Sequence, residues 1–266
     1  MVKSNNTNSF QEGVDENPLC AMILGSMKKF RKNLAFTLAE VLITLGIIGI
    51  VAAMVIPSLI NAYQKHVTVT RLKQTYAQIT QAVKLSEADN GDITGWDMGT
   101  ATLHKRAEGI EFANKYILPY LKYSYICNNT KSYCNDIIIK NIKGDNTDSA
   151  FKNDFAIALM NGTIIRLDPR DTYTFITVHI NGGSSSNIIG KNVFSLLLKK
   201  DLKISNYVIV KEPGIYFMGE GYTREYLTSS GYSRYLCSKQ GALFAGNYCG
   251  ALIKLDGWKI SKDYPW

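Results

Sequence analysis

Residues 36–60 read FTLAEVLITLGIIGIVAAMVIPSLI, and Glu40 is the single charged side chain in this stretch of 25 residues. A helix of that length extends for about 37 Å at about 1.5 Å per residue. The hydrocarbon layer of a bilayer is about 30 Å thick, so such a helix is long enough to cross it. The stretch therefore predicts a membrane-spanning helix over residues 36–60.

The residues before this stretch predict its orientation. Residues 28–32 read KKFRK and carry four basic side chains, a pattern that favours the cytoplasmic side of a membrane. We therefore expect residues 1–35 to form a cytoplasmic leader, and Met27 is a second candidate start because a compact basic leader begins there. The rest of the chain is expected on the other side of the membrane.

An apolar stripe continues the helix beyond the membrane. Apolar side chains recur there at steps of three and four residues, which is the helical period. They are Val69, Leu72, Tyr76, Ile79 and Val83. The sequence Asp89-Asn90-Gly91 is typical of a helix end. We predict an amphipathic continuation over residues 61–90, and one uninterrupted helix from Phe36 to Asp89 would be about 80 Å long.

Residues 91–266 are predicted to form an extracytoplasmic domain. A short helix is expected over residues 105–118, because Pro119 cannot continue it. Turn residues such as Asn161-Gly162 separate apolar runs that favour strands. The expected strands are 155–160, 163–167, 173–180, 206–211 and 251–255. Residues 213–249 are rich in Gly, Tyr and Ser and are expected to be long surface loops. The expected fold class is α+β, with a long N-terminal helical spine packed on a small antiparallel β-sheet and disulfide-tied loops.

The cysteines fit an oxidising compartment. Cys20 precedes the apolar stretch, and four follow it in two pairs that are local in the sequence: Cys127, Cys134, Cys237 and Cys249. An even number favours two disulfides, although spacing alone leaves their connectivity open. Zinc is the alternative, but neither pair has the spacing of a zinc knuckle and no histidine is close in the sequence.

Glu40 is the most informative residue, because an ionised carboxylate in a membrane segment costs several kcal/mol unless it finds a partner. In one interpretation it lies near the cytoplasmic end of the helix and reaches the lipid headgroups. In the other, cleavage of the chain just before Phe36 creates an α-amino group at the same depth. A carboxylate four residues further on can then pair with the amine of its own chain or of a neighbouring chain.

The sequence AFTLAEVLI at residues 35–43 resembles the cleavage and methylation site of type IV prepilins and type II secretion pseudopilins. The resemblance implies that a prepilin peptidase cuts between Ala35 and Phe36 and methylates the new N-terminus of Phe36. It also implies that Glu40 sets the registration of subunits and that Pro57 kinks the helix. This sequence departs from the family in having Ala35 where Gly is usual, Ala39 in place of a bulkier aliphatic residue, and a long leader.

The resemblance extends loosely beyond this motif. The segments VHINGGSSSNIIGKNVF and DGWKISKDYPW are similar to those of a pseudopilin-like group often labelled type II secretion system protein, in which an Asp commonly stands at the position of His179. An ordinary secretory signal is a competing interpretation, but Ile60-Asn61-Ala62 fits its cleavage site poorly.

No enzyme motif is present, and the histidines His66, His104 and His179 are scattered. We expect His66 on the exposed side of the spine and a structural role for His179. Asp168 and Asp171 flank a turn and could offer oxygens to Ca²⁺, but turn chemistry is the commoner reason for such a pair. We expect no cofactor and no metal site.

The predicted function is that of a structural subunit of a type IV pilus-like or type II secretion filament. The implied partners are a prepilin peptidase and methyltransferase, other pilin or pseudopilin subunits, an inner-membrane assembly platform and membrane lipid. The net charge is +8, but the sequence contains no run of five basic residues. The charge distribution therefore does not favour nucleic-acid binding. A single-pass membrane-anchored binding domain that does not polymerise is the alternative of a different class.

Overall fold

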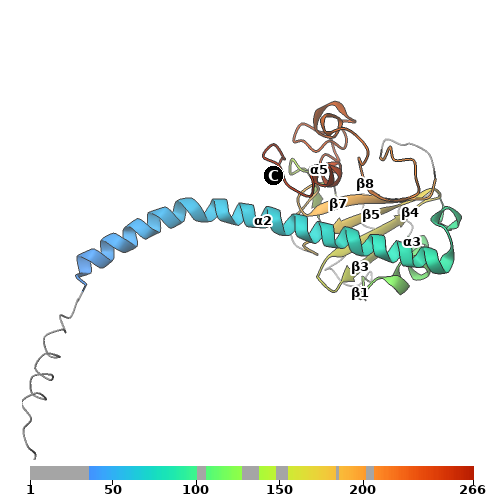
Figure 1. The fold of residues 1–266 in the computed structure, drawn as a ribbon, viewed down its shortest axis with the longest axis horizontal. Coiled ribbons are helices and arrows are strands. Elements are labelled where there is room, and N and C mark those ends of the chain that lie inside the picture. Colours follow the sequence, from blue (N-terminus) through green and yellow to red (C-terminus); the bar gives the residue numbers. More distant parts are fainter. Residues whose placement is uncertain (1–35, 101–105, 128–137, 148–154, 184–185, 202–206) are drawn as a thin grey trace, which may run out of the picture. The chain divides into compact units, whose positions relative to one another are not determined.

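The computed structural model describes residues 36–100, 106–127, 138–147, 155–183, 186–201 and 207–266 (Figure 1). The predicted leader, Ala35, His104, Cys20 and Cys134 lie outside these residues. The chain divides into two units, one ending at Ser58 and the other running from Leu59 to Trp266.

Helix α2 (Leu38–Asn90) confirms the long N-terminal helix. Within the second unit it buries one stripe of side chains, as the sequence predicts: Leu72, Ile79 and Val83 are buried, and Val69 and Tyr76 pack against them. The next residue, Gly91, has φ of +79°, the left-handed conformation in which a glycine commonly ends a helix.

Six strands form one antiparallel sheet in the order β1-β3-β4-β5-β7-β8 (Figure 1). Their bounds are β1 Tyr123–Ile126, β3 Phe155–Leu159, β4 Ile164–Pro169, β5 Tyr173–His179, β7 Val193–Lys199 and β8 Gly214–Phe217. A parallel pair of two-residue strands, β2 (Ile139–Lys140) and β6 (Asn187–Ile188), forms a second small sheet. The structure confirms the small antiparallel sheet.

The predicted hairpin joins β3 and β4 through Asn161 and Gly162. Gly162 has φ of +80°, and the Asn161 side-chain oxygen accepts a hydrogen bond from the Thr163 N–H at 3.0 Å. A hydrogen bond from the Leu159 N–H to the Thr163 carbonyl at 2.8 Å closes the hairpin. The turn chemistry read from the sequence is therefore the chemistry that the structure uses.

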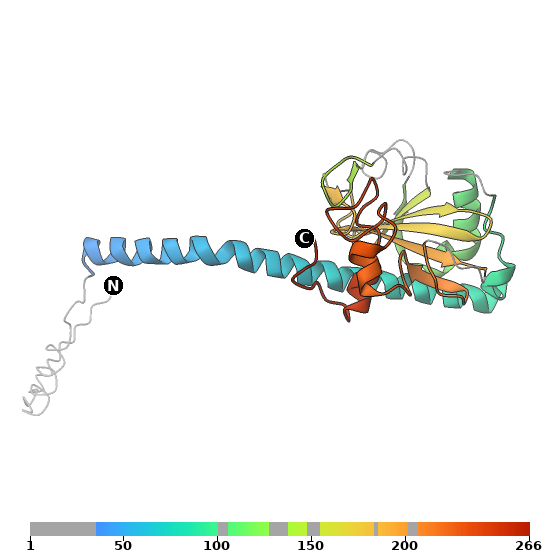
Figure 2. The same ribbon diagram turned by 90° about the horizontal axis from the view of Figure 1, so that it is seen from above.

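The main core lies between the sheet and the helices. Helix α2, helix α3 (Arg106–Tyr116) and helix α5 (Cys249–Leu255) all contribute to one apolar cluster, and Figure 2 shows the helices against the strands from above. Strand β3 alternates between two clusters: Phe155, Ile157 and Leu159 join the main core, whereas Ala156 and Ala158 join a smaller one. This is the two-residue period of a strand that is covered on both faces. Two short 3-10 helices, η1 (Ile93–Gly95) and η2 (Leu118–Tyr120), flank α3.

Two predicted strands are wrong. Residues 251–255 belong to helix α5, because Ala251, Leu252 and Ile253 are consecutive and all buried, a pattern that suits a short helix as well as a strand. Residues 207–211 form no strand. The Val210 and Lys211 carbonyls instead accept hydrogen bonds from the Lys199 ammonium group at 3.2 and 3.3 Å, so they are not available to a neighbouring strand.

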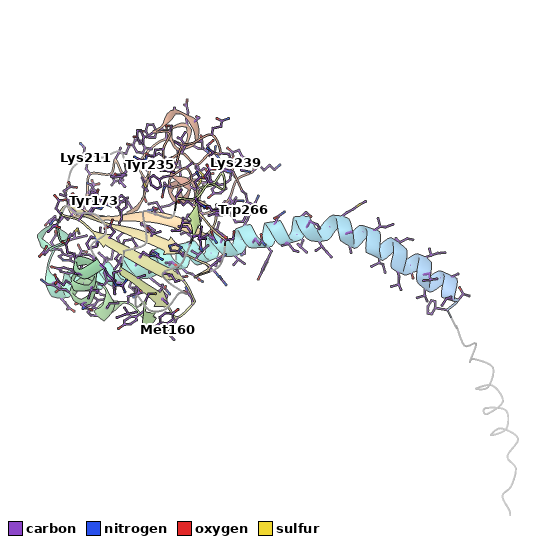
Figure 3. The ribbon with its side chains drawn as sticks, turned by 180° about the vertical axis from the view of Figure 1, so that it is seen from behind. Met160, Tyr173, Lys211, Tyr235, Lys239 and Trp266 are labelled. Carbon is purple, nitrogen blue, oxygen red and sulfur yellow. A yellow bond between two sulfur atoms is a disulfide. The ribbon has the colours of Figure 1, made fainter. Side chains whose placement is uncertain are left out.

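The predicted surface loop over residues 213–249 is also only partly right. It contains strand β8 and a single π-helical turn, η4 (Tyr226–Ser230), and it buries Phe217, Leu227 and Tyr248. The aromatic rings of this region pack against one another; Tyr235, labelled in Figure 3, contacts Tyr207, Tyr232 and Tyr248. Much of the tyrosine content therefore serves packing.

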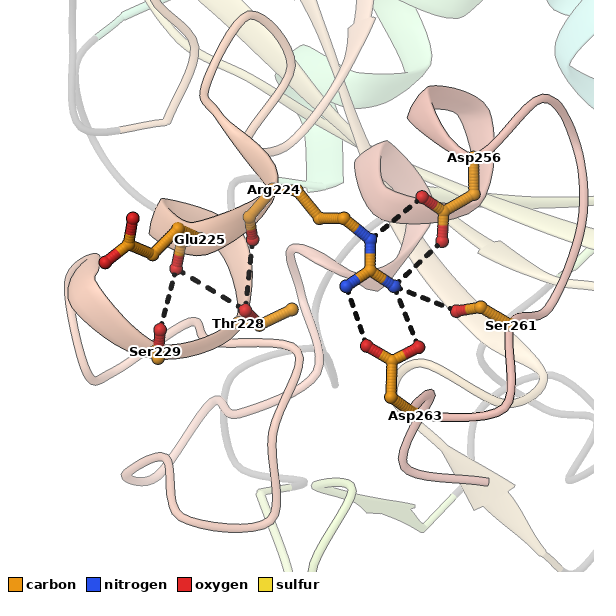
Figure 4. A network of polar contacts seen from close by, with 7 residues as sticks. All are labelled: Arg224, Glu225, Thr228, Ser229, Asp256, Ser261 and Asp263. Carbon is orange, nitrogen blue, oxygen red and sulfur yellow. Dashed lines mark hydrogen bonds and ion pairs between the residues drawn. The ribbon is translucent and has the colours of Figure 1, made fainter.

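Covalent and ionic contacts hold the C-terminal segment together. Cys237 and Cys249 form a disulfide, which confirms the disulfide-tied loop, and Cys127 is also disulfide-bonded. Figure 4 shows the Arg224 guanidinium between the carboxylates of Asp256 and Asp263, with four N–O distances of 2.7 to 3.2 Å. The π-helical turn is thereby joined to the last residues of the chain.

Replacing both Cys237 and Cys249 by alanine is expected to lower the free energy of unfolding by about 3 kcal/mol, because the bond closes a short loop in the unfolded chain. Chemical denaturation of the full chain in a mild detergent measures the change. Alanine avoids burying a new hydroxyl at two buried positions. Equal midpoints for the two proteins would contradict a stabilising role for this bond.

Candidate functional site

The apolar stretch of helix α2 is almost entirely exposed. Leu38 is 80% exposed and Met54 is 75% exposed, and only Ala52 between Phe36 and Ile60 is partly covered. An 18-residue window of this helix has a mean hydropathy of 2.5 and none of it is buried. An apolar surface this long is costly in water, so it needs a membrane or partner helices around it.

Each polar side chain in this stretch is satisfied within the helix. The Thr44 hydroxyl donates to the Val41 carbonyl at 3.0 Å, and the Ser58 hydroxyl donates to the Val55 carbonyl at 2.8 Å. Thr37 and Glu40, the remaining two, bond to each other. Groups that are paired within one segment do not oppose its transfer into lipid as unpaired ones do.

Thr37 and Glu40 form a capping box at the start of helix α2. The Glu40 N–H donates to the Thr37 hydroxyl oxygen at 3.2 Å, and the Thr37 N–H donates to Glu40 Oε2 at 2.9 Å. The Thr37 hydroxyl donates to the same Oε2 at 2.9 Å. The arrangement satisfies backbone N–H groups that lack a helical partner, and it places a negative charge where the helix dipole favours one.

Thr37 is not among the site residues predicted from the sequence, although the sequence carries the signal for its role. A Thr followed three residues later by a Glu, just before an apolar run, is the signature of a capping box. The structure brings Phe36, Thr37 and Glu40 together at the first turn. Because Glu40 already bonds the Thr37 N–H, an amine created at Phe36 would lie one residue away from the carboxylate.

Pro57 lies inside helix α2. It has no N–H, so the Ala53 carbonyl loses its usual helical donor. The division between the two units falls one residue later, between Ser58 and Leu59. The predicted kink at Pro57 stays a prediction.

Asp168, one of the two carboxylates considered for Ca²⁺, pairs with an arginine instead. Asp168 is buried, and its Oδ2 atom accepts hydrogen bonds from Arg170 at 3.1 and 2.6 Å. The Asp168 carboxylate therefore forms an ion pair with an arginine two residues further along the same turn. Within the described parts of the chain, no group of three His, Cys, Asp or Glu side chains is placed to hold a metal ion.

The two described histidines have opposite environments. His66 is exposed on helix α2, as expected, whereas His179 at the end of β5 is completely buried. Burial, and then the positive charge of Arg166, lower the pKa of the His179 imidazole from its ordinary 6.5 to about 3. His179 is therefore neutral at ordinary pH.

The comparisons with known proteins match both parts of the chain. The model of a family of unknown function (DUF6613) matches residues 58–266, more than half of the chain. The model of the prokaryotic N-terminal methylation motif matches residues 30–56. Neither the curated proteins nor the solved structures contain a match.

We expect the stability of the protein to fall with acid through His179. The unfolded chain protonates this residue near pH 6.5 but the folded protein only near pH 3. The free energy of unfolding should therefore fall by up to about 1.4 kcal/mol per pH unit below pH 6.5. Denaturation of wild type and His179→Gln between pH 4 and 7 gives the two slopes, and the variant should have the flatter one. His66→Gln, which alters an exposed histidine, should keep the wild-type slope; a shared slope for all three proteins would refute the assignment.

Thr37→Ala is expected to loosen the first turn of helix α2 by about 1 kcal/mol, because it removes the hydroxyl from the capping box. Hydrogen exchange of the full chain in lipid nanodiscs should then be faster at the amides of residues 38–41. Thr37→Ser keeps the hydroxyl and should exchange like the wild type. Unchanged protection in Thr37→Ala would mean that the capping box contributes nothing to the helix start.

Proposed function

We propose that this chain, which belongs to the family of unknown function DUF6613, is a structural subunit of a pilin- or pseudopilin-type filament that assembles through helix α2. The methylation motif makes it a type IV pilin-like, prepilin-type protein. Such a motif indicates a precursor for prepilin peptidase and a structural protein rather than an enzyme.

The observation that carries the proposal is the exposed apolar half of helix α2 with its single carboxylate. Before assembly this half lies in lipid, in a single-pass inner-membrane protein with residues 1–35 in the cytoplasm and residues 61–266 outside. After assembly it lies against the equivalent helices of neighbouring subunits. The apolar surface stays away from water in both states, so the transfer from membrane to filament costs little hydrophobic free energy.

Cleavage between Ala35 and Phe36 is the step that prepares Glu40 for assembly. Hydrolysis of this peptide bond leaves a carboxylate on Ala35 and an amine on Phe36. The peptidase then transfers a methyl group to this amine from a sulfonium methyl donor, which leaves as the thioether, and the methylated amine carries a positive charge. The capping box supplies hydrogen bonds to Glu40 but does not neutralise its charge. The described residues use only Oε2 of Glu40, so Oε1 is left to pair with the amine of a neighbouring subunit.

The remaining partners follow from the same arrangement. Extraction of an apolar helix from a membrane requires an assembly platform, and a filament requires other pilin-like subunits. The disulfide between Cys237 and Cys249 fits an extracytoplasmic location, where oxidised cysteines persist. A filament in the periplasm and one at the cell surface both meet these conditions.

Glu40→Ala is expected to be cleaved normally but to enter filaments at least about tenfold less, because a buried amine would lose its charged partner. Mass spectrometry of the N-terminus measures cleavage and methylation, and the sheared filament fraction measures incorporation. Glu111→Ala, which removes an exposed carboxylate from α3, is the matched control.

Normal incorporation of Glu40→Ala would refute the registration role. An intact leader on wild-type protein recovered from membranes would refute the filament proposal as a whole. It would favour an anchored binding domain that does not polymerise.

A further inference from the structure

We infer that Lys65 and Lys191, which both lie over the ring of Trp266, form with the neighbouring Lys239 a binding site for the phosphate headgroup of an anionic phospholipid in the outer leaflet of the inner membrane. This inference rests on the proposed membrane-spanning role of residues 36–60. It goes beyond that role by naming an anionic lipid as a ligand and the residues that bind it.

Two of these lysines contact the indole ring of Trp266. The ammonium groups of Lys65 and Lys191 each lie 5.9 Å from the centre of its indole ring, within the range of a cation–π contact. Lys65 comes from helix α2, and Lys191 follows β6. The fold thus brings three parts of the chain that are far apart in the sequence to one place.

Lys239 adds a third positive charge. Burial, and then the like charge of Lys239, lower the pKa of Lys191. Figure 3 shows Lys239 and Trp266 on the same side of the lobe. Like charges held together without a counterion favour the binding of an anion.

No acid among the described residues neutralises the cluster. The ion pairs of the described chain do not include Lys65, Lys191 or Lys239. From Asn61 to Ser86, helix α2 itself has four Lys and Arg residues and no acid.

A groove beside Trp266 offers room for a headgroup. It has a volume of about 590 Å³ and runs between helix α2 and the segment around β6, with Tyr63, Gln64, Ser186, Lys191 and Trp266 among its lining residues. No aspartate or glutamate lines it. The amide and hydroxyl groups of Gln64 and Ser186 can donate hydrogen bonds to phosphate oxygens.

The position of the cluster along helix α2 selects lipid as the occupant. Lys65 follows Ile60, the last residue of the apolar stretch, by five residues, or about 7 Å of helix. The headgroup layer is about 5–7 Å thick on each side of the hydrocarbon, and a helical side chain leans back toward the N-terminus of its helix. The Lys65 ammonium therefore lies at headgroup depth. Trp266 and Tyr63, which is 68% exposed, are residue types enriched at this depth.

The test uses the full chain in nanodiscs of phosphatidylcholine that contain 10 mol% of a brominated lipid, which quenches nearby tryptophan. Brominated phosphatidylglycerol is compared with brominated phosphatidylcholine. Trp96 is buried and Trp258 is half-buried, so the signal of Trp266 is taken as the difference between the wild type and Trp266→Phe. Flotation of the discs with the protein measures membrane insertion separately.

We expect the wild type to prefer phosphatidylglycerol by at least about fivefold, since each lysine near a membrane surface contributes about that factor. The preference of the Lys65→Gln, Lys191→Gln double variant should be at least about fivefold weaker than that of the wild type. Lys84→Gln, an exposed lysine about 28 Å further along the same helix, should keep the wild-type preference. The preference should also weaken as salt increases.

Equal quenching of the wild type by the two lipids would overturn the inference while leaving the proposed function intact. An equal loss in Lys84→Gln and in the double variant would overturn it too, because the effect would then be one of overall charge. A chain that fails to insert into either kind of disc would refute both this inference and the membrane role on which it rests.

Discussion

The exposed apolar half of helix α2 is the constraint on which the rest of the structure depends. A side-chain surface of this kind is unfavourable in water, and no other described part of the chain covers it. This surface is therefore stable only in lipid or against other helices. Each local feature of the segment agrees with that requirement: its hydroxyls bond to the helix itself, and its one carboxylate lies at the end where backbone N–H groups can hold it.

The second half of the same helix meets a different requirement. Its stripe of buried side chains belongs to the core of a globular unit, so one helix carries both an exposed apolar half and a half that forms a layer of that core. The Tyr76 ring stacks on Phe217 with 5.1 Å between centres, and its hydroxyl donates to the Ile215 carbonyl at 3.1 Å. The Lys254 ammonium group donates to the same hydroxyl at 3.0 Å. Strand β8 and helix α5 are therefore fastened to the helix that continues from the membrane segment.

The sequence predicted the features that depend on local periodicity and turn chemistry. The stripe from Val69 to Val83 and the Asn161-Gly162 hairpin are right because each pattern is written within a few residues. Strand β7 was missed because all of its residues are buried, which removes the alternation that marks a strand covered on one face. Helix α5 resembles a strand in the sequence because its seven residues are too few to display a helical period.

Of the candidate sites too, only those formed by residues close in the sequence could be predicted from it. The pairing of Thr37 with Glu40 spans three residues and could be read from the sequence as a capping box. The meeting of Lys65, Lys191 and Trp266 could not, because those residues are separated by more than 70 positions each and only the tertiary fold unites them. Likewise, the burial of His179 follows from its place in the sheet between Ile164 of β4 and Val193 of β7 rather than from any neighbour in the sequence.

The last residues reach helix α2 because the chain reverses sharply after α5. Gly257 and Trp258 both have positive φ, of 73° and 61°, and Trp258 is the sole described residue other than glycine in that conformation. A bulky residue adopts it at a cost, which the packing of the indole against Tyr76 and Phe217 offsets. The reversal, held by Arg224 through Asp256 and Asp263, returns the C-terminal segment toward the turns of α2 that follow the apolar stretch. The fold thus keeps two tryptophans against the turns of α2 that follow the apolar stretch: Trp266 lies at Lys65, and Trp258 lies at Lys73 and Tyr76.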